Sequence, residues 1–112
     1  MKQPTDLSAQ EILSQLEAVL DSRKDAQAES SYVASLYQKG LDSILKKIGE
    51  EATETVIAAK EGDREQIIYE VADLWFHVMV MLRQQNISSQ EILLELKRRF
   101  GLSGIEEKDS RK

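Results

Sequence analysis

Hydrophobic residues recur along the chain at intervals of three and four, which is the periodicity of amphipathic helices. Five such stretches are separated by short segments rich in residues that end or cap helices. Strand-like alternation of polar and apolar residues is absent from the sequence. The pattern therefore predicts an all-α fold with helices over residues 7–21, 31–39, 41–60, 64–85 and 89–100.

Short connections join these predicted helices. Gly40 and Gly62 stand where the second and third helices should stop, and Asp63 is placed to cap the fourth. Because short links make successive helices antiparallel neighbours, we expect an up-down bundle of four to five helices. A single domain should span residues 1–100, followed at residues 101–112 by a flexible C-terminal tail with two glycines and six charges.

The fourth predicted helix is more apolar than a surface helix should be. Between Ile67 and Leu82, thirteen of sixteen residues are apolar or aromatic, and the exceptions are Glu70, Asp73 and His77. A helix that is apolar on every side needs cover on every side, which a monomer of 112 residues offers in few places. We therefore expect an intertwined homodimer with this helix near the interface; a central helix in a monomeric bundle is the alternative.

Composition narrows the classes of function. A net charge of −5 is unlike the basic surface of a general nucleic-acid or membrane binder. The chain has no cysteine, which excludes disulfides, thiolate zinc sites and thiol nucleophiles. Neither a secretory signal nor a membrane-spanning run stands out, so a cytoplasmic location is expected.

Two pairs of carboxylates are placed symmetrically about Gly62. Glu51 and Glu54 lie eleven and eight residues before it, and Glu70 and Asp73 lie eight and eleven residues after it. In an antiparallel hairpin, residues equally far from the turn lie at the same height. The four carboxylates would form a square if the two acidic helix faces point towards each other. The periodicity alone does not decide whether these faces point towards each other or apart.

A cluster of four or five carboxylates repels itself unless cations are bound. Oxygen ligands favour Mg²⁺ or Mn²⁺, and Mg²⁺ usually completes its shell with water and phosphate oxygens. A di-iron site is disfavoured because the chain has one histidine. The pattern therefore indicates a hydrolase that transfers a phosphoryl or pyrophosphoryl group. The alternative is a non-catalytic helical dimerisation module in which each acid pairs with a lysine or arginine.

The segments that carry these acids resemble a known family. Residues 46–54 (KKIGEEATE) and 70–77 (EVADLWFH) are similar to the phosphoribosyl-ATP pyrophosphatases, within the all-α NTP pyrophosphatase (MazG-like) superfamily. Residues 31–36 (SYVASL) and 87–93 (ISSQEIL) extend the likeness, which covers about residues 5–100. Trp75 departs from the family pattern, where a smaller apolar residue or tyrosine is expected.

The resemblance implies a nucleotide substrate and a reaction. Phosphoribosyl-ATP would be hydrolysed with Mg²⁺ to phosphoribosyl-AMP and pyrophosphate, the second step of histidine biosynthesis. Glu51, Glu54, Glu70 and Asp73 would hold the metal, and Glu50 or Glu51 would activate the attacking water. A house-cleaning pyrophosphatase that acts on (d)NTPs is the alternative within the same class.

Other polar residues near these motifs are expected to contact the nucleotide. Lys47 would bind phosphate, although its spacing suits a helical salt bridge equally well. Lys60 is a further phosphate contact, and Tyr32 and Ser31 would help to hold the nucleotide or its ribose, although Ser31 also suits a helix N-cap. For His77 we expect a hydrogen-bonded core position, because neutral imidazole is a poor ligand of Mg²⁺, and a place at the edge of the site is the alternative.

Overall fold

The computed structural model describes residues 6–100, in which all regular structure is helical. The helices are α1 (Ala9–Ser22), α2 (Tyr32–Lys39), α3 (Leu41–Glu61), α4 (Arg64–Gln84) and α5 (Ser89–Arg98), with a 3₁₀ turn, η2, at Ala28–Ser30. The all-α fold and its five helices are thus confirmed, each end within two residues of its expected position. None of these helices is both long and apolar enough to cross a membrane. The tail expected at residues 101–112 lies outside the described residues.

Side chains define where the helices begin. Ser8, Ser31, Asp63 and Ser88 accept hydrogen bonds from backbone N–H groups in the first turns of α1, α2, α4 and α5. Gly62 ends α3 with a φ of 80°, a left-handed conformation that favours glycine. The chain reverses at this residue, and α4 returns along α3.

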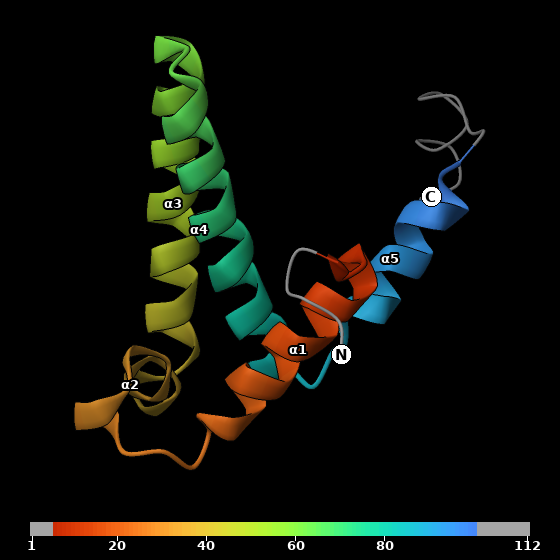
Figure 1. Ribbon diagram of the computed structural model, residues 1–112. Coiled ribbons are helices and arrows are strands. Elements are labelled where there is room, and N and C mark those ends of the chain that lie inside the picture. Colours follow the sequence, from red (N-terminus) through yellow and green to blue (C-terminus); the bar gives the residue numbers. More distant parts are fainter. Residues whose placement is uncertain (1–5, 101–112) are drawn as a thin grey trace, which may run out of the picture.

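The antiparallel hairpin of α3 and α4 is the longest feature of the molecule and projects away from the other helices (Figure 1). At its open end, α2 packs against α3, while α1 contacts α4 and α5. Helices α3 and α4 are the antiparallel neighbours that the short link predicts. In contrast, α5 makes its main helix contact with α1 and diverges from α4 (Figure 1).

A network of charged groups explains the direction of α5. The guanidinium of Arg83 in α4 donates to both carboxylate oxygens of Asp21 in α1, at 2.9 and 3.0 Å, and to the carbonyl oxygen of Ile87 at 3.0 Å. It also lies 3.5 Å from the carboxylate of Glu17. Glu17 accepts hydrogen bonds from the backbone N–H and the hydroxyl of Ser89. These charge-assisted bonds direct the start of α5 onto α1.

The core lies where α1, α2 and the open end of the hairpin meet. Leu20, Ile44 and Val80 are completely buried there. Several other residues expected to face inward are instead exposed, because the buried face of α3 runs through Ile44, Glu51 and Ala58 and because α5 diverges from α4. The apolar residues spaced at three and four along the predicted helices were expected to face inward, and those that are exposed are Val19, Tyr32, Leu41, Leu45, Val56, Ala59, Ile92, Leu96 and Phe100.

The ion pair between Asp21 and Arg83 generates a prediction for stability. The hydrogen bond from Arg83 holds the pKa of Asp21 below its usual value. The ionised Asp21 therefore stabilises the fold above its unfolded-state pKa, and this contribution is lost as the pH falls through the lowered pKa. We expect Asp21→Asn to reduce stability by up to about 1 kcal/mol at pH 7, since the pair is partly exposed.

Thermal melts from neutral pH downwards measure this difference. The difference between wild type and Asp21→Asn should shrink as the pH falls through the lowered pKa of the folded carboxyl group, and it should vanish once that group is protonated in both folded and unfolded chains. Asp25→Asn, at an exposed position in the following loop, is the control and should change little. A deficit of the Asp21 variant that persisted undiminished in acid would contradict the interpretation.

Candidate functional site

Buried carboxylates lie in the middle of the α3–α4 hairpin. Glu51 on α3 and Glu70 on α4 are only 7% and 6% exposed, and Asp73, one turn beyond Glu70, is half-buried. Thr55 marks the common height of the two helices, because its hydroxyl lies 2.8 Å from the carbonyl oxygen of Glu51 and 3.3 Å from that of Glu70. The two helices therefore meet in the register that equal spacing about Gly62 predicts.

This cluster has too little positive charge to neutralise it. Within residues 6–100, Lys47 is the only lysine or arginine that forms ion pairs with these acids. Its Nζ lies 3.4 Å from Glu51 and 3.5 Å from Glu50. The carboxylate of Glu70 has no ion pair in this part of the chain. Because a buried carboxylate without compensation costs several kcal/mol, the arrangement favours a bound cation.

The pKa values of Glu51 and Lys47 reflect the excess of negative charge around them. Burial raises the pKa of Glu51, and the adjacent carboxyl group of Asp73 raises it further, while Lys47 opposes both effects. Partial burial also disfavours the charge of Lys47, but nearby Tyr32 and the Glu51 and Glu50 carboxylates outweigh it, and its pKa is raised. Lys47 thus forms the helical salt bridge that its spacing allows.

Three side chains are close enough to share one metal ion. Glu51, Asp73 and His77 each place a ligand atom within 4.8 Å of the other two. His77 is 2% exposed, and both of its ring nitrogens have partners: Nδ1 lies 2.8 Å from the backbone oxygen of Asp73, and Nε2 lies 2.7 Å from the hydroxyl of Tyr32. It is therefore both the hydrogen-bonded core residue that we expected and a neighbour of the acids.

The other predicted site residues take different places. Glu54 lies one helical turn from Glu51, exposed and outside the three-residue group, and Glu50 is exposed beside Lys47. Tyr32 is half-exposed at the edge of the cluster. Ser31 caps α2 through the backbone N–H of Ala34 at 3.1 Å. Lys60 stands near the tip of the hairpin, roughly 14 Å along α3 from Glu51.

Thr55 was not anticipated from the sequence; its hydroxyl joins the backbones of α3 and α4 at the height of the acids. The four-residue spacing of Asp73 and His77 on one helix face is the signal that places His77 beside the carboxylates.

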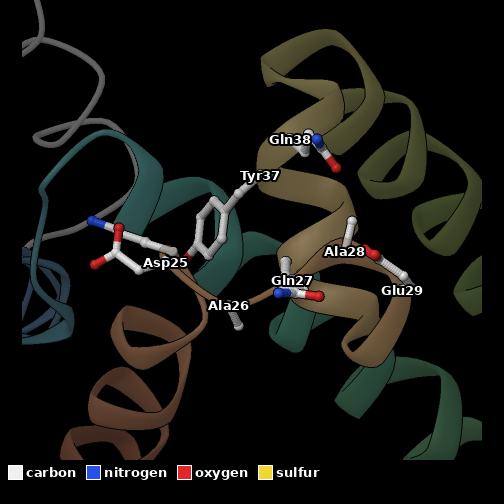
Figure 2. Close-up of a pocket in the computed structure, with 9 residues that line it drawn as sticks. Asp25, Ala26, Gln27, Ala28, Glu29, Tyr37 and Gln38 are labelled. Carbon is white, nitrogen blue, oxygen red and sulfur yellow. The ribbon is translucent and has the colours of Figure 1, made fainter.

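A separate pocket of about 490 Å³ lies between α2 and the loop after α1 (Figure 2). Residues 24–29 line it together with Ala34, Tyr37 and Gln38. The hydroxyl of Tyr37 is buried and has no hydrogen-bond partner among the described residues. This lining mixes positive, negative and amide groups and includes none of the predicted site residues, so the acidic cluster remains the candidate site.

Comparison with known proteins identifies the family of the chain. Residues 13–100 match the sequence family described as Phosphoribosyl-ATP pyrophosphohydrolase. A protein of Methylococcus capsulatus named phosphoribosyl-ATP pyrophosphatase is 60% identical over 102 residues, which cover 91% of this chain and 97% of that protein. Proteins of the same name from Hydrogenovibrio crunogenus and Geobacter metallireducens are each 59% identical, over 90% of this chain and 93% of their own length. The resemblance seen in the motifs is confirmed, and the chain belongs to the phosphoribosyl-ATP pyrophosphohydrolase family of enzymes.

Proposed function

We propose that this protein hydrolyses phosphoribosyl-ATP to phosphoribosyl-AMP and pyrophosphate in the cytoplasm, as the second step of histidine biosynthesis. The observation that carries the proposal is the proximity of the buried Glu51 and the half-buried Asp73 in the middle of the hairpin, with the buried Glu70 one turn from Asp73 on α4. Lys47 is the one lysine or arginine within residues 6–100 that pairs with Glu51. The names of relatives about 60% identical to the chain support the choice of substrate. A triphosphate needs positive charge, which a chain of net charge −5 lacks unless it binds a metal.

The donor atoms of the cluster suit Mg²⁺, because carboxylate oxygens are the ligands it prefers in proteins. We assign the metal to Glu51, Glu54, Glu70 and Asp73, two acids from each arm of the hairpin. Bound Mg²⁺ would neutralise the triphosphate and the charge that develops on the departing pyrophosphate.

The side chains around the acids would complete the reaction. Glu51 and its exposed neighbour Glu50 are the two carboxylates proposed to take the proton of the attacking water. Lys47 would exchange its contacts with these glutamates for a phosphate oxygen of the substrate. Tyr32 and Ser31, at the start of α2, are assigned to the nucleotide or its ribose. Lys60 is assigned to phosphate further along the hairpin.

The proposed working form is a homodimer. Val56 on α3 and Tyr69 and Trp75 on α4 are each more than 60% exposed. Trp75 also borders an apolar groove of about 410 Å³ between α1, α4 and α5. Monomeric proteins rarely leave hydrophobic surface of this extent open to water, and a second copy would offer the same helix faces to cover it.

The substrate is tested by measuring pyrophosphate release from phosphoribosyl-ATP and from a panel of dNTPs and modified NTPs. We expect phosphoribosyl-ATP to give a kcat/KM at least about 100-fold higher than any other nucleotide, because contacts to its second ribose contribute transition-state binding. Equal or better turnover of a dNTP would favour the house-cleaning pyrophosphatase. An absence of turnover on every nucleotide would favour the dimerisation module.

The metal ligands are tested by Asp73→Asn and Glu54→Gln. Each variant should lose pyrophosphate release by about 100-fold or more while its circular dichroism stays unchanged, because each removes a charge that holds the cation. Glu61→Gln, about two turns beyond Glu54 on α3, is the matched control and should remain active. Full activity in either ligand variant would refute its assignment.

Metal binding itself is measured by thermal melts with and without Mg²⁺. Wild type should gain about 5 °C or more at saturating Mg²⁺, and Asp73→Asn should lose most of this gain. A salt-bridged scaffold would show no gain in either protein, since its acids would already be compensated.

The homodimer is tested by Trp75→Glu, which places a charge in the proposed interface. We expect the wild type to sediment as a dimer and the variant to dissociate at least about tenfold more readily, because a buried unpaired carboxylate is costly. Gln38→Glu adds the same charge at an exposed position of α2 and should stay dimeric. A wild-type monomer at micromolar concentration would overturn the assignment.

A further inference from the structure

We infer that His77 is a positioning residue that holds the hydroxyl of Tyr32 at the edge of the carboxylate cluster, and that it does not bind the metal. The inference rests on the proposed function. It gives His77 a role, holding Tyr32, that is separate from binding the metal. It follows from the hydrogen bonds of the imidazole ring, which join α2 to α4 beside the acids.

The partners of the ring define its tautomer. Nδ1 lies 2.8 Å from the backbone oxygen of Asp73, and a carbonyl oxygen can only accept a hydrogen bond. Nδ1 therefore carries a proton, and it also lies 3.5 Å from a carboxylate oxygen of Asp73. We assign the lone pair of Nε2 as the acceptor of the Tyr32 hydroxyl proton, with Nε2 and the hydroxyl oxygen 2.7 Å apart. Both nitrogens are occupied, so a metal bond to either one would break an existing hydrogen bond in a site that is 2% exposed.

Aromatic neighbours hold the imidazole in this orientation. The rings of Tyr32 and Phe76 each meet it edge to face, with centroids 5.8 and 5.4 Å away. Burial raises the pKa of the Tyr32 phenol, which keeps it protonated as the donor to His77. The ring of Tyr32 thus has little freedom to turn away from α4.

The hydroxyl of Tyr32 and the rest of its side chain have different surroundings. Its hydroxyl is engaged with His77, while 51% of the residue remains exposed next to the acids. The exposed part of Tyr32 is therefore available to a nucleotide while the hydroxyl proton stays engaged with His77. A ring held in advance costs less conformational entropy when the ribose or base binds, so loss of the hydrogen bond should weaken substrate binding more than the chemical step.

Tyr37 provides a matched control on the same helix. Its hydroxyl has no hydrogen-bond partner within the described residues. Tyr32→Phe and Tyr37→Phe each remove a tyrosine hydroxyl, at positions five residues apart. Only Tyr32→Phe removes a hydrogen bond to His77.

The tautomer can be observed directly, because His77 is the only histidine of the chain. A long-range ¹H–¹⁵N spectrum of the ¹⁵N-histidine-labelled, tag-free protein should show a protonated Nδ1 and an unprotonated Nε2, both unchanged by Mg²⁺. Tyr32→Phe should shift the Nε2 resonance, and Tyr37→Phe should not. A proton on Nε2, protons on both nitrogens, or a large change at either nitrogen on adding Mg²⁺ would overturn the inference.

Kinetics provide the second readout. We expect Tyr32→Phe to raise the KM for phosphoribosyl-ATP about 3- to 10-fold with kcat within about twofold, the usual effect of one lost hydrogen bond, and Tyr37→Phe to change neither. His77→Gln, whose amide reaches the position of Nε2, should keep a lower KM than His77→Asn. The Mg²⁺ affinity of folded His77→Gln should match that of wild type; a tenfold loss would identify His77 as a ligand.

The two proposals fail separately. Wild type that does not hydrolyse phosphoribosyl-ATP would refute the proposed function, while the nitrogen resonances would still report the tautomer and its link to Tyr32. Active wild type with an unchanged KM in Tyr32→Phe would refute only the positioning role.

Discussion

The interaction on which the structure depends is the burial of carboxylates between α3 and α4. Two antiparallel helices of this length pack best through apolar side chains, yet Glu51 and Glu70 occupy the facing sides of the hairpin and are almost inaccessible. Lys47 reaches Glu51 but is shared with Glu50. The hairpin thus retains an electrostatic penalty that a positive charge placed beside these carboxylates would relieve.

The parts of the fold that local chemistry determines could be predicted from the sequence. The caps at Ser8, Asp63 and Ser88 and the left-handed Gly62 define helix ends through neighbouring residues alone. The register of the acids follows from equal spacing about the turn, and Thr55 shows that the two helices keep it. The sequence alone therefore predicts a helical hairpin with acidic residues on both of its arms.

Contacts between segments that are far apart in the sequence could not be predicted from the sequence pattern. Periodicity identifies an apolar face but not what covers it, which is why Val56 and Ile92 are exposed although their pattern predicted the interior. The direction of α5 depends on Arg83, whose partners in α1 lie more than sixty residues earlier. Likewise, the place of His77 depends on Tyr32, which comes from a different helix. The metal ligands and the second subunit stay predictions.

Trp75 has a practical consequence. It is the only tryptophan in the chain, and its side chain borders the apolar groove while remaining 63% exposed to water. Indole emission responds to the polarity of its surroundings, so whatever closes over the groove will move the intrinsic fluorescence of the protein towards the blue. The molecule thus contains its own optical reporter of association, which needs no added dye and senses the groove without touching the acidic cluster.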